Sequence, residues 1–263
     1  MTWSFSRIDV TCYADFYQNY ILGKAKEANG WNEMGKFCHN IVEQVGGGLI
    51  TTKQGHQLFV DNFYDCIEHP FPKSQYWTDP EGSYFSKIEP WFAREVWWEE
   101  EVKSVEEHFE FELPSGEKFQ CFVDQIGTTK DGKILIRDFK VAKKYSKTEV
   151  LKKVKQLHIY AYAYKQKYGE YPDLLEFQYF QSGTPPHVFK VNEKDVLATI
   201  AWAEARIIEI KEKIEKSKTE KGHFNPDYDE LGKGFTRGYY CMNICSFRLD
   251  CPFVSGEFFK SFN

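Results

Sequence analysis

The segment ILIRDFKVAKK, residues 134–144, joins an apolar run to a carboxylate and an ammonium group. Alternate residues of a strand share a face, so Asp138 and Lys140 would point to one side and Phe139 to the other. A strand end that frays into solvent explains an isolated D-x-K pattern equally well. The surrounding residues decide between the two interpretations.

A second carboxylate, Asp124, precedes this segment by one predicted turn at residues 128–132. Pairing of the two flanking strands about that turn would bring Asp124 and Asp138 to neighbouring strands. Two unpaired carboxylates repel each other, and a divalent cation relieves the repulsion. Oxygen ligands favour Mg²⁺ or Mn²⁺, and Lys140 would then orient a water or hold a phosphate oxygen.

The rest of the pattern predicts the elements that position these residues. Residues 31–45 have the spacing of an amphipathic helix, and three glycines end it. Residues 50–95 are predicted as short helices and loops. A capping box at Ser146 begins another helix, which Gly169 ends. Strands are predicted within residues 102–113, 118–127, 134–140, 174–183 and 187–192, and a long helix over residues 193–218. This order predicts an α/β fold with a central mixed sheet flanked by helices.

The bulk composition predicts a globular chain that forms one domain over residues 1–263. Hydrophobic residues make up 42% and aromatic residues 17% of the sequence. No apolar run reaches the roughly 20 residues of a membrane span. The first residues lack the pattern of a secretory signal. We therefore expect a cytoplasmic protein, in a bacterial or phage-infected cell, with no membrane partner.

The net charge of −5 argues weakly against a nucleic-acid-binding protein, but the charge is unevenly distributed. Residues 140–155 hold seven lysines and one glutamate. A local basic patch suits phosphate contact whatever the total charge, although a solvated helix face explains the same residues. The lysines predicted to contact nucleic acid are Lys143, Lys144, Lys147, Lys152 and Lys153.

The seven cysteines are an odd number in a chain without a secretory signal, which argues against a disulfide framework. Cys38 and Cys121 lie within apolar patterns and are predicted to belong to the core, while Cys66 has no clear assignment. The remaining cysteines are Cys12, near the start, and a late group of Cys241, Cys245 and Cys251.

The stretch FVDQIGTTKDGKILIRDFKVAKK, followed by KQLHIYAYA, resembles the PD-(D/E)XK nuclease superfamily, specifically its RecB-like branch. That family has an Asp in one strand, a turn, a D-x-K strand and then Q-x-x-x-Y on the next helix. Cys121 stands where the family commonly has a glycine. The positions that match the pattern, and that the resemblance implies are catalytic, are Asp124, Asp138, Lys140, Gln156 and Tyr160.

The amino-terminal part of the chain carries the same resemblance. The segment SFSRIDVTCYADFYQNYILG resembles the opening of the branch, and GKFCHNIVE resembles its G-x-x-x-H motif. The resemblance implies a restriction-endonuclease-like core in which His39, Asp124 and Asp138 hold Mg²⁺ or Mn²⁺. The carbonyl of Phe139 is implied as a further metal ligand, and Gln156 and Tyr160 as residues that position the DNA strand.

The spacing of the cysteines resembles an iron–sulfur variant of the RecB-like branch. One early and three late cysteines there hold a [4Fe–4S] cluster that joins the two ends of the chain. Here the late spacing is C-x3-C-x5-C, one residue longer in the first gap than is usual. The implied cluster ligands are Cys12, Cys241, Cys245 and Cys251, within residues 1–25 and 232–263. Four thiolates also suit zinc, which is the lesser alternative, and core cysteines without a metal are the third.

The resemblance implies a metal-dependent DNA exonuclease that hydrolyses phosphodiester bonds in DNA recombination, repair or processing. The implied partners are DNA with a free end and recombination or repair proteins. One alternative is a CRISPR-adaptation nuclease that trims spacer precursors. Others are a catalytically inactive, nuclease-derived DNA-binding scaffold and a small redox iron–sulfur protein.

Overall fold

The computed structural model describes residues 1–10, 12–71, 78–181, 185–219, 241, 244–249 and 251 of the chain. These residues belong to two compact units. The larger unit comprises Met1–Phe5, Asn29–Phe71 and Tyr76–Glu204, and the smaller unit comprises the remainder. Every residue predicted for catalysis lies in the larger unit, and the four cysteines predicted as cluster ligands lie in the smaller one. A single domain over residues 1–263 stays a prediction.

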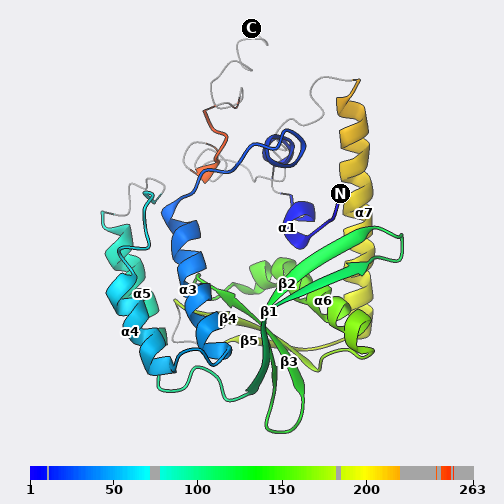
Figure 1. Ribbon diagram of the computed structural model, residues 1–263. Coiled ribbons are helices and arrows are strands. Elements are labelled where there is room, and N and C mark those ends of the chain that lie inside the picture. Colours follow the sequence, from blue (N-terminus) through cyan, green and yellow to red (C-terminus); the bar gives the residue numbers. More distant parts are fainter. Residues whose placement is uncertain are drawn as a thin grey trace. The chain divides into compact units, whose positions relative to one another are not determined.

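The larger unit is built on a five-stranded sheet with the order β1-β2-β3-β4-β5 (Figure 1). Strands β3 and β4 are parallel, and every other neighbouring pair is antiparallel, which confirms the predicted mixed sheet. Strands β1 and β2 form the longest strand pair, and β2 pairs with β3 only from Gln125 to Thr128. The strands are β1 (Glu101–Glu112), β2 (Lys118–Thr128), β3 (Ile134–Lys140), β4 (Leu174–Tyr179) and β5 (His187–Lys190).

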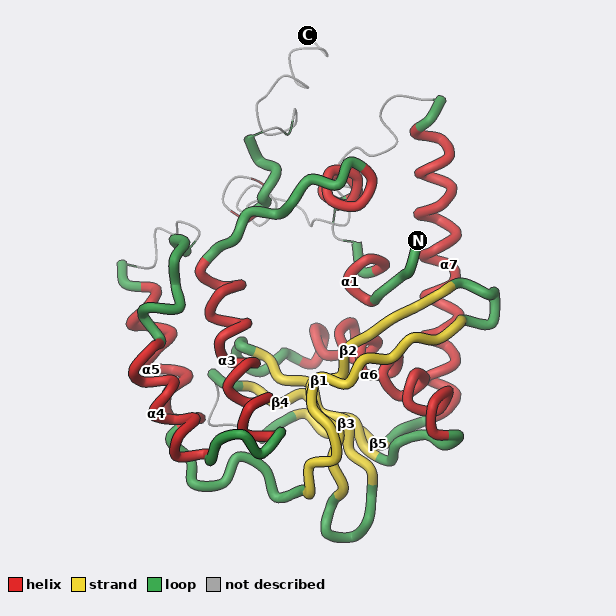
Figure 2. The backbone as a smooth tube through the Cα atoms, in the orientation of Figure 1, coloured by secondary structure: helices red, strands yellow, loops and turns green. Residues whose placement is uncertain are grey.

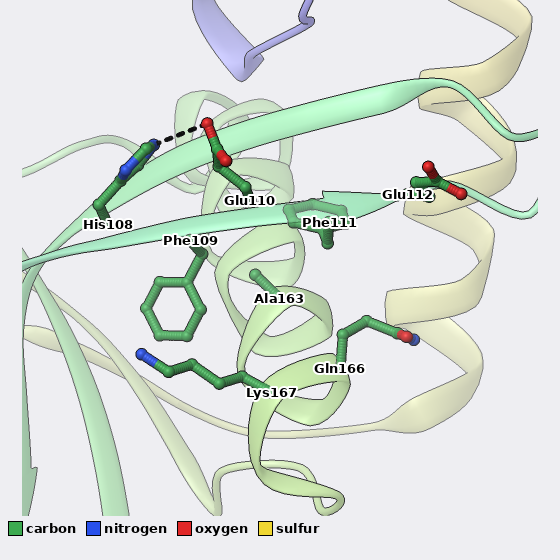
Figure 3. A pocket seen from close by; sticks show the side chains of 8 residues that line it. All are labelled: His108, Phe109, Glu110, Phe111, Glu112, Ala163, Gln166 and Lys167. Atoms are coloured by element: carbon green, nitrogen blue, oxygen red, sulfur yellow. Dashed lines mark ion pairs between the residues drawn. The ribbon is translucent and has the colours of Figure 1, made fainter.

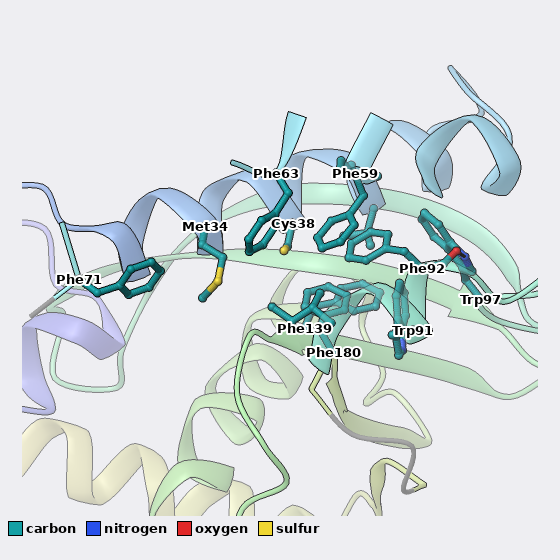
Figure 4. Packing of buried hydrophobic residues seen from close by; sticks show 13 residues of the cluster. Met34, Cys38, Phe59, Phe63, Phe71, Trp91, Phe92, Trp97, Phe139 and Phe180 are labelled. Carbon is teal, nitrogen blue, oxygen red and sulfur yellow. Dashed lines mark hydrogen bonds between the residues drawn. The ribbon is translucent and has the colours of Figure 1, made fainter. Parts of the chain in front are cut away.

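Helices α3 (Gly30–Gly46), α4 (Thr52–Asn62) and α5 (Pro80–Phe92) pack together against one face of this sheet. Their apolar side chains form an aromatic-rich core with Phe139 of β3 and with Phe180, which follows β4 (Figure 4). The rings of Phe139 and Phe180 are stacked, with centroids 5.5 Å apart. This packing fixes α3, which carries His39, against the strand that carries Asp138.

The segment predicted as short helices and loops contains two longer helices, α4 of 11 residues and α5 of 13 residues. A capping box between Thr51 and Gln54 begins α4. Asp79 caps α5, and Pro80 occupies its first turn, where the missing N–H would have had no helical partner anyway. A proline in this segment can therefore mark the start of a helix as well as a loop. Burial of the aromatic residues of α4 and α5 in the core stabilises the two helices.

Helix α6 (Lys147–Tyr168) has the predicted bounds. The Ser146 capping box is present, and Gly169 ends the helix with φ of 88°, a conformation that favours glycine. The long helix α7 (Glu193–Ser217) also matches its prediction and continues from the larger unit into the smaller one. None of the helices in the described ranges is long and apolar enough to cross a lipid bilayer.

The smaller unit contains the early segment Ser6–Ala28 and the second part of α7, which Figure 2 draws among the helices. Its early elements are α2 (Tyr13–Phe16) and the π-helix η1 (Tyr17–Ile21), while α1 (Phe5–Ile8) begins at the boundary with the larger unit. Within this unit the hydroxyl of Tyr13 donates to Glu209, and Lys213 lies 4.1 Å from the centre of the Tyr13 ring. These contacts attach the segment that carries Cys12 to α7.

Candidate active site

The register of the β1–β2 hairpin places Glu106 across from Asp124. Val105 pairs with Gln125, and Glu107 pairs with Val123. Glu106 lies between these two pairs and has φ of 46°, a left-handed conformation that non-glycine residues rarely adopt. Such conformations cost free energy and are concentrated at functional sites. The strand is therefore distorted at the residue that faces Asp124.

His39 reaches the same point from α3. One ligand atom each from His39, Glu106 and Asp124 lies within 4.8 Å of the others. The His39 Nδ1 atom lies 3.5 Å from Asp124 Oδ2. An imidazole and two carboxylates are a ligand set that binds divalent cations. The structure thus brings His39 and Asp124 together, as predicted, and adds Glu106.

Asp124 lies where strands β2 and β3 separate, because their pairing ends at Gln125 and Arg137. Its Oδ2 atom accepts a hydrogen bond of 2.7 Å from the backbone N–H of Phe139. Burial, together with the nearby charge of Asp138, raises the pKa of Asp124 well above its usual value. The two carboxylates thus share one electrostatic environment.

Asp138 and Lys140 belong to a closed ring of polar side chains. Lys140 Nζ lies 2.6 Å from Asp138 Oδ2 and donates to Gln156 Oε1 over 3.1 Å. The Gln156 amide donates over 2.7 Å to the hydroxyl of Tyr160, which in turn donates over 3.4 Å to Asp138 Oδ1. All four side chains come from β3 and α6. The ring fixes the position of the ammonium group beside the two carboxylates.

The charges around the ring shift the ionisation of its neighbours. Burial would lower the pKa of Lys140, but Asp138 and Asp124 outweigh it, and the pKa is raised. Burial lowers the pKa of His39, which favours the neutral imidazole that metal ions require. Burial, with Glu43 and Asp138, raises the pKa of Glu106. The carboxyl groups of Glu106, Asp124 and Asp138 therefore lie close enough to disfavour one another's ionisation, and a cation would stabilise their ionised forms.

This donor set fits a hard divalent cation. It offers two carboxylates whose pKa values are raised by burial and nearby negative charge, and one imidazole whose pKa is lowered by burial. A bound cation would stabilise the ionised carboxylates and accept the neutral imidazole. Phe139, whose carbonyl is a predicted ligand, adjoins the set, since its backbone N–H donates to Asp124 Oδ2. Asp138 adjoins the set through Asp124 and Lys140.

The predicted DNA-contacting lysines lie at and before the start of α6. Lys143, Lys147 and Lys152 are exposed, so they are available to a phosphate backbone. Lys144 is half-buried and donates to the Pro185 carbonyl over 2.6 Å, which occupies it in this structure. Lys153 is half-buried. Nucleic-acid contact by these lysines stays a prediction.

Sequence reasoning missed Glu106, although a signal for it exists. The turn after β1 pairs Glu112 with Lys118, and that register, continued along the hairpin, brings Glu106 opposite Asp124. Glu106 is one of several glutamates in VEEHFEFE, so its position there does not distinguish it. Its neighbour Glu107 has a different role. Its carboxylate accepts hydrogen bonds from Lys167 and Tyr168 of α6.

A buried network on the other face of the strand supports the site. The guanidinium of Arg137 donates to Gln125 over 2.6 Å and to Glu100 over 3.0 Å, and it also donates to Glu176. These bonds connect β3 to both of its neighbouring strands, next to Asp138. A buried arginine with several partners is expected to hold the strand register at this position.

The four cysteines predicted as cluster ligands are neighbours in the smaller unit. Cys12 interacts electrostatically with Cys241 and Cys245, and Cys245 with Cys251. Burial raises the pKa of the Cys12 thiol, and it raises that of Cys245 to about 11. No three of these sulfur atoms lie within 4.8 Å of one another in the described part of the chain. A bound cluster therefore stays a proposal.

The other cysteines follow the sequence analysis. Cys38 and Cys121 are buried, as predicted for core residues. Cys66, which had no assignment, is half-buried and donates from its thiol to the Phe63 carbonyl over 3.0 Å. These three thiols belong to the packing of the larger unit.

Comparisons with known proteins bear on the family and the fold. A family model described as PD-(D/E)XK nuclease superfamily matches residues 2–252. A search of curated proteins found no match. Among solved structures, the chain is similar to a predicted exonuclease from Eubacterium rectale, with 14% identity, a TM-score of 0.51, and coverage of 88% of this chain and 85% of that chain. The match to the structure of SSO0001 covers 91% of this chain and 94% of that chain at 12% identity, with a TM-score of 0.34.

Proposed function

The chain belongs to the PD-(D/E)XK nuclease superfamily, and on that premise we propose that it is a divalent-metal-dependent DNA exonuclease. The observation that carries the proposal is the convergence of His39, Glu106 and Asp124 next to the ring that holds Lys140. These groups combine a cation site with a fixed positive charge, which is what hydrolysis of a phosphodiester requires.

Each residue has a role that follows from its contacts. His39, Glu106 and Asp124 would hold Mg²⁺ or Mn²⁺, with Asp138 beside them. Such a cation supplies positive charge that stabilises the transition state at phosphorus and acidifies an attacking water. Lys140, fixed by Asp138 and Gln156, would hydrogen-bond that water or a phosphate oxygen. Tyr160 and Gln156 would keep Lys140 and Asp138 in place.

The exposed lysines before and on α6 would bind the DNA backbone. Contacts between ammonium groups and phosphates release counterions, so affinity should fall steeply as salt concentration rises. Sequence-independent backbone contact suits an exonuclease, which removes nucleotides regardless of base. The proposed partner is therefore DNA with a free end.

The experiment that tests this function is digestion of end-labelled linear DNA, single- and double-stranded, with Mg²⁺, Mn²⁺ or a chelator. We expect metal-dependent loss of linear DNA and no cutting of closed circular DNA. Cutting of the circle would show an endonuclease, including one that trims spacer precursors. No cleavage with either metal would leave the inactive DNA-binding scaffold as the better interpretation.

Glu106→Gln is expected to weaken Mn²⁺ binding and to reduce the rate at subsaturating metal by at least about 10-fold. The substitution keeps the size of the side chain and removes the charge that faces Asp124. Isothermal titration with Mn²⁺ and cleavage rates against metal concentration would measure both effects. Glu107→Gln is the matched control, because Glu107 bonds to Lys167 and Tyr168 instead. Equal metal affinity in the two variants would remove Glu106 from the site.

We also propose that Cys12, Cys241, Cys245 and Cys251 hold a [4Fe–4S] cluster that is structural, with zinc as the alternative. Burial and the neighbouring cysteines disfavour the thiolate forms of Cys12 and Cys245, and a bound metal would stabilise those thiolates. The cluster would attach residues near Cys12 to the late part of the smaller unit. Visible absorbance and metal analysis would distinguish iron from zinc.

Cys245→Ala is expected to lower soluble yield and nuclease activity together, because one ligand is lost and the segment carrying Cys12 is released. Iron content per chain and the melting temperature measure the structural part of the effect. Cys66→Ala is the control, since that thiol lies in the larger unit. A Cys245→Ala protein that folds and cuts at the parent rate would contradict the structural role.

A further inference from the structure

An exposed aromatic pair lies beside the candidate active site on the β1–β2 hairpin. The rings of His108 and Phe122 are stacked, with centroids 4.4 Å apart and an angle of 9° between their planes. The two residues pair across the strands, and Phe122 is 50% exposed. Figure 3 shows His108 and Glu110 on the opposite side of β1 from Phe109, whose ring points toward α6. The stacked pair therefore offers flat ring surface to solvent.

This pair is next to the proposed metal ligands. Phe122 precedes Asp124 by two residues in β2, and alternate residues of a strand share a face. The two positions are therefore about 7 Å apart along the strand. Glu106 and Asp124 are opposite each other, and His108 with Phe122 is the next pair on the same face of the hairpin. A base attached to a nucleotide whose phosphate lies at the site would reach the rings.

Hairpin stability does not account for the position of the pair. Cross-strand aromatic pairs do stabilise hairpins, but this hairpin is already anchored on its other face. There Phe109 and Phe111 contact Tyr168 and Tyr162 of α6. A pocket of about 420 Å³ is lined by residues of β1 and α6, among them His108 as well as Phe109 and Phe111. The stacked rings on the exposed face are additional to this packing.

The charge around the pair favours an uncharged occupant. The Glu110 carboxylate lies 3.9 Å from His108 Nε2, and Glu106 lies at the other end of the pair. A phosphate placed there without a cation would be repelled, whereas a base has a neutral aromatic face. Bases stack on aromatic side chains with little regard to sequence, because every base has such a face.

We propose that His108 and Phe122 form a stacking platform for an unpaired nucleobase of the DNA strand that is cut. This inference rests on the proposed nuclease function and extends it to the form of the substrate. Only a base that has left its duplex stack exposes its full face. The platform therefore selects single-stranded DNA or a frayed end at the site.

The test compares binding of two labelled strands of equal length, an oligothymidylate and an abasic strand, by fluorescence anisotropy. Ca²⁺ replaces Mg²⁺ so that the strands remain intact during the measurement. We expect Phe122→Thr, which keeps a strand-forming residue, to weaken oligothymidylate binding about 5- to 100-fold. Its affinity for the abasic strand should stay unchanged, and Phe122→Trp should retain the parent affinity for both. His108→Thr, which removes the other ring, should give a smaller loss of the same kind.

Tyr64→Thr is the matched control, because Tyr64 is a 51% exposed aromatic residue outside the hairpin. Equal losses for the two strands, or no loss for either, would overturn the platform. If Phe122→Thr does not fold, His108→Thr gives the same comparison. Failure of the proposed function is a separate result, in which the parent protein binds bases through these rings but does not cleave DNA with Mg²⁺.

Discussion

Asp124→Asn should reduce the rate of DNA cleavage by about 10³-fold or more, comparable with the loss of a major electrostatic group from an active site. The asparagine retains an oxygen that can accept from the Phe139 N–H, so the local structure should survive. The charge that binds the cation is lost. Single-turnover cleavage at saturating DNA and several Mg²⁺ concentrations would measure the effect.

The same variant should be more stable than the parent protein in the presence of a chelator. The pKa of Asp124 is raised in the folded state, chiefly by burial and then by Asp138. Folding therefore favours the protonated form of Asp124. The stability that this contributes is lost as the pH rises from the pKa of the unfolded chain, about 4, through the raised pKa of the folded protein. Asparagine has no charge to bury, so its advantage should be present at neutral pH and vanish below about pH 4.

Thermal unfolding with and without Mg²⁺ tests this linkage. Each kcal/mol of added stability should raise the melting temperature by about 2–4 °C for a chain of this size. Mg²⁺ should stabilise the parent protein more than the variant, since it binds the parent more tightly. Asp61→Asn, an exposed aspartate of α4, is the control and should change neither rate nor metal response. If the variant is less stable than the parent protein in chelator, the ionised Asp124 carboxylate beside Asp138 does not destabilise the metal-free parent protein.

Lys140→Met should reduce the cleavage rate by about 10²- to 10³-fold at saturating Mg²⁺, without weakening metal binding. Methionine preserves much of the side-chain volume but removes the ammonium group that contacts Asp138 and Gln156. Metal affinity should stay constant or increase, because a positive charge next to the cation site is gone. Manganese titration and single-turnover rates separate the two effects.

Lys165→Met is the matched control, since Lys165 lies on the same helix as Gln156 and pairs with Glu193 far from the ring. It should cut at the parent rate. If Lys140→Met also loses metal binding, the lysine acts through the carboxylates and has no direct role at the phosphate. If it cuts normally, the ring is structural only.

The local chemistry of the site was predictable from sequence because it lies in short, regular segments. Asp138 and Lys140 share a strand face by alternation, and Gln156 and Tyr160 share a helix face by one turn. The capping box at Ser146 and the glycine at 169 determine where α6 begins and ends, through hydrogen bonds within a few residues. The resemblance to the nuclease superfamily depends on these same local patterns, and the family match confirms it.

The remaining features depend on contacts between residues distant in the chain, which local patterns do not specify. Glu106 joins the site through hairpin register and an unusual backbone conformation, and His39 joins it through the packing of α3 on the sheet. Burial of aromatic residues turned the proline-containing segment at 50–95 into two full helices. The sequence thus indicated most of the groups proposed for the chemistry, while the tertiary structure decided which of them meet, because side chains converge only once the sheet twists and the helices bury their apolar faces.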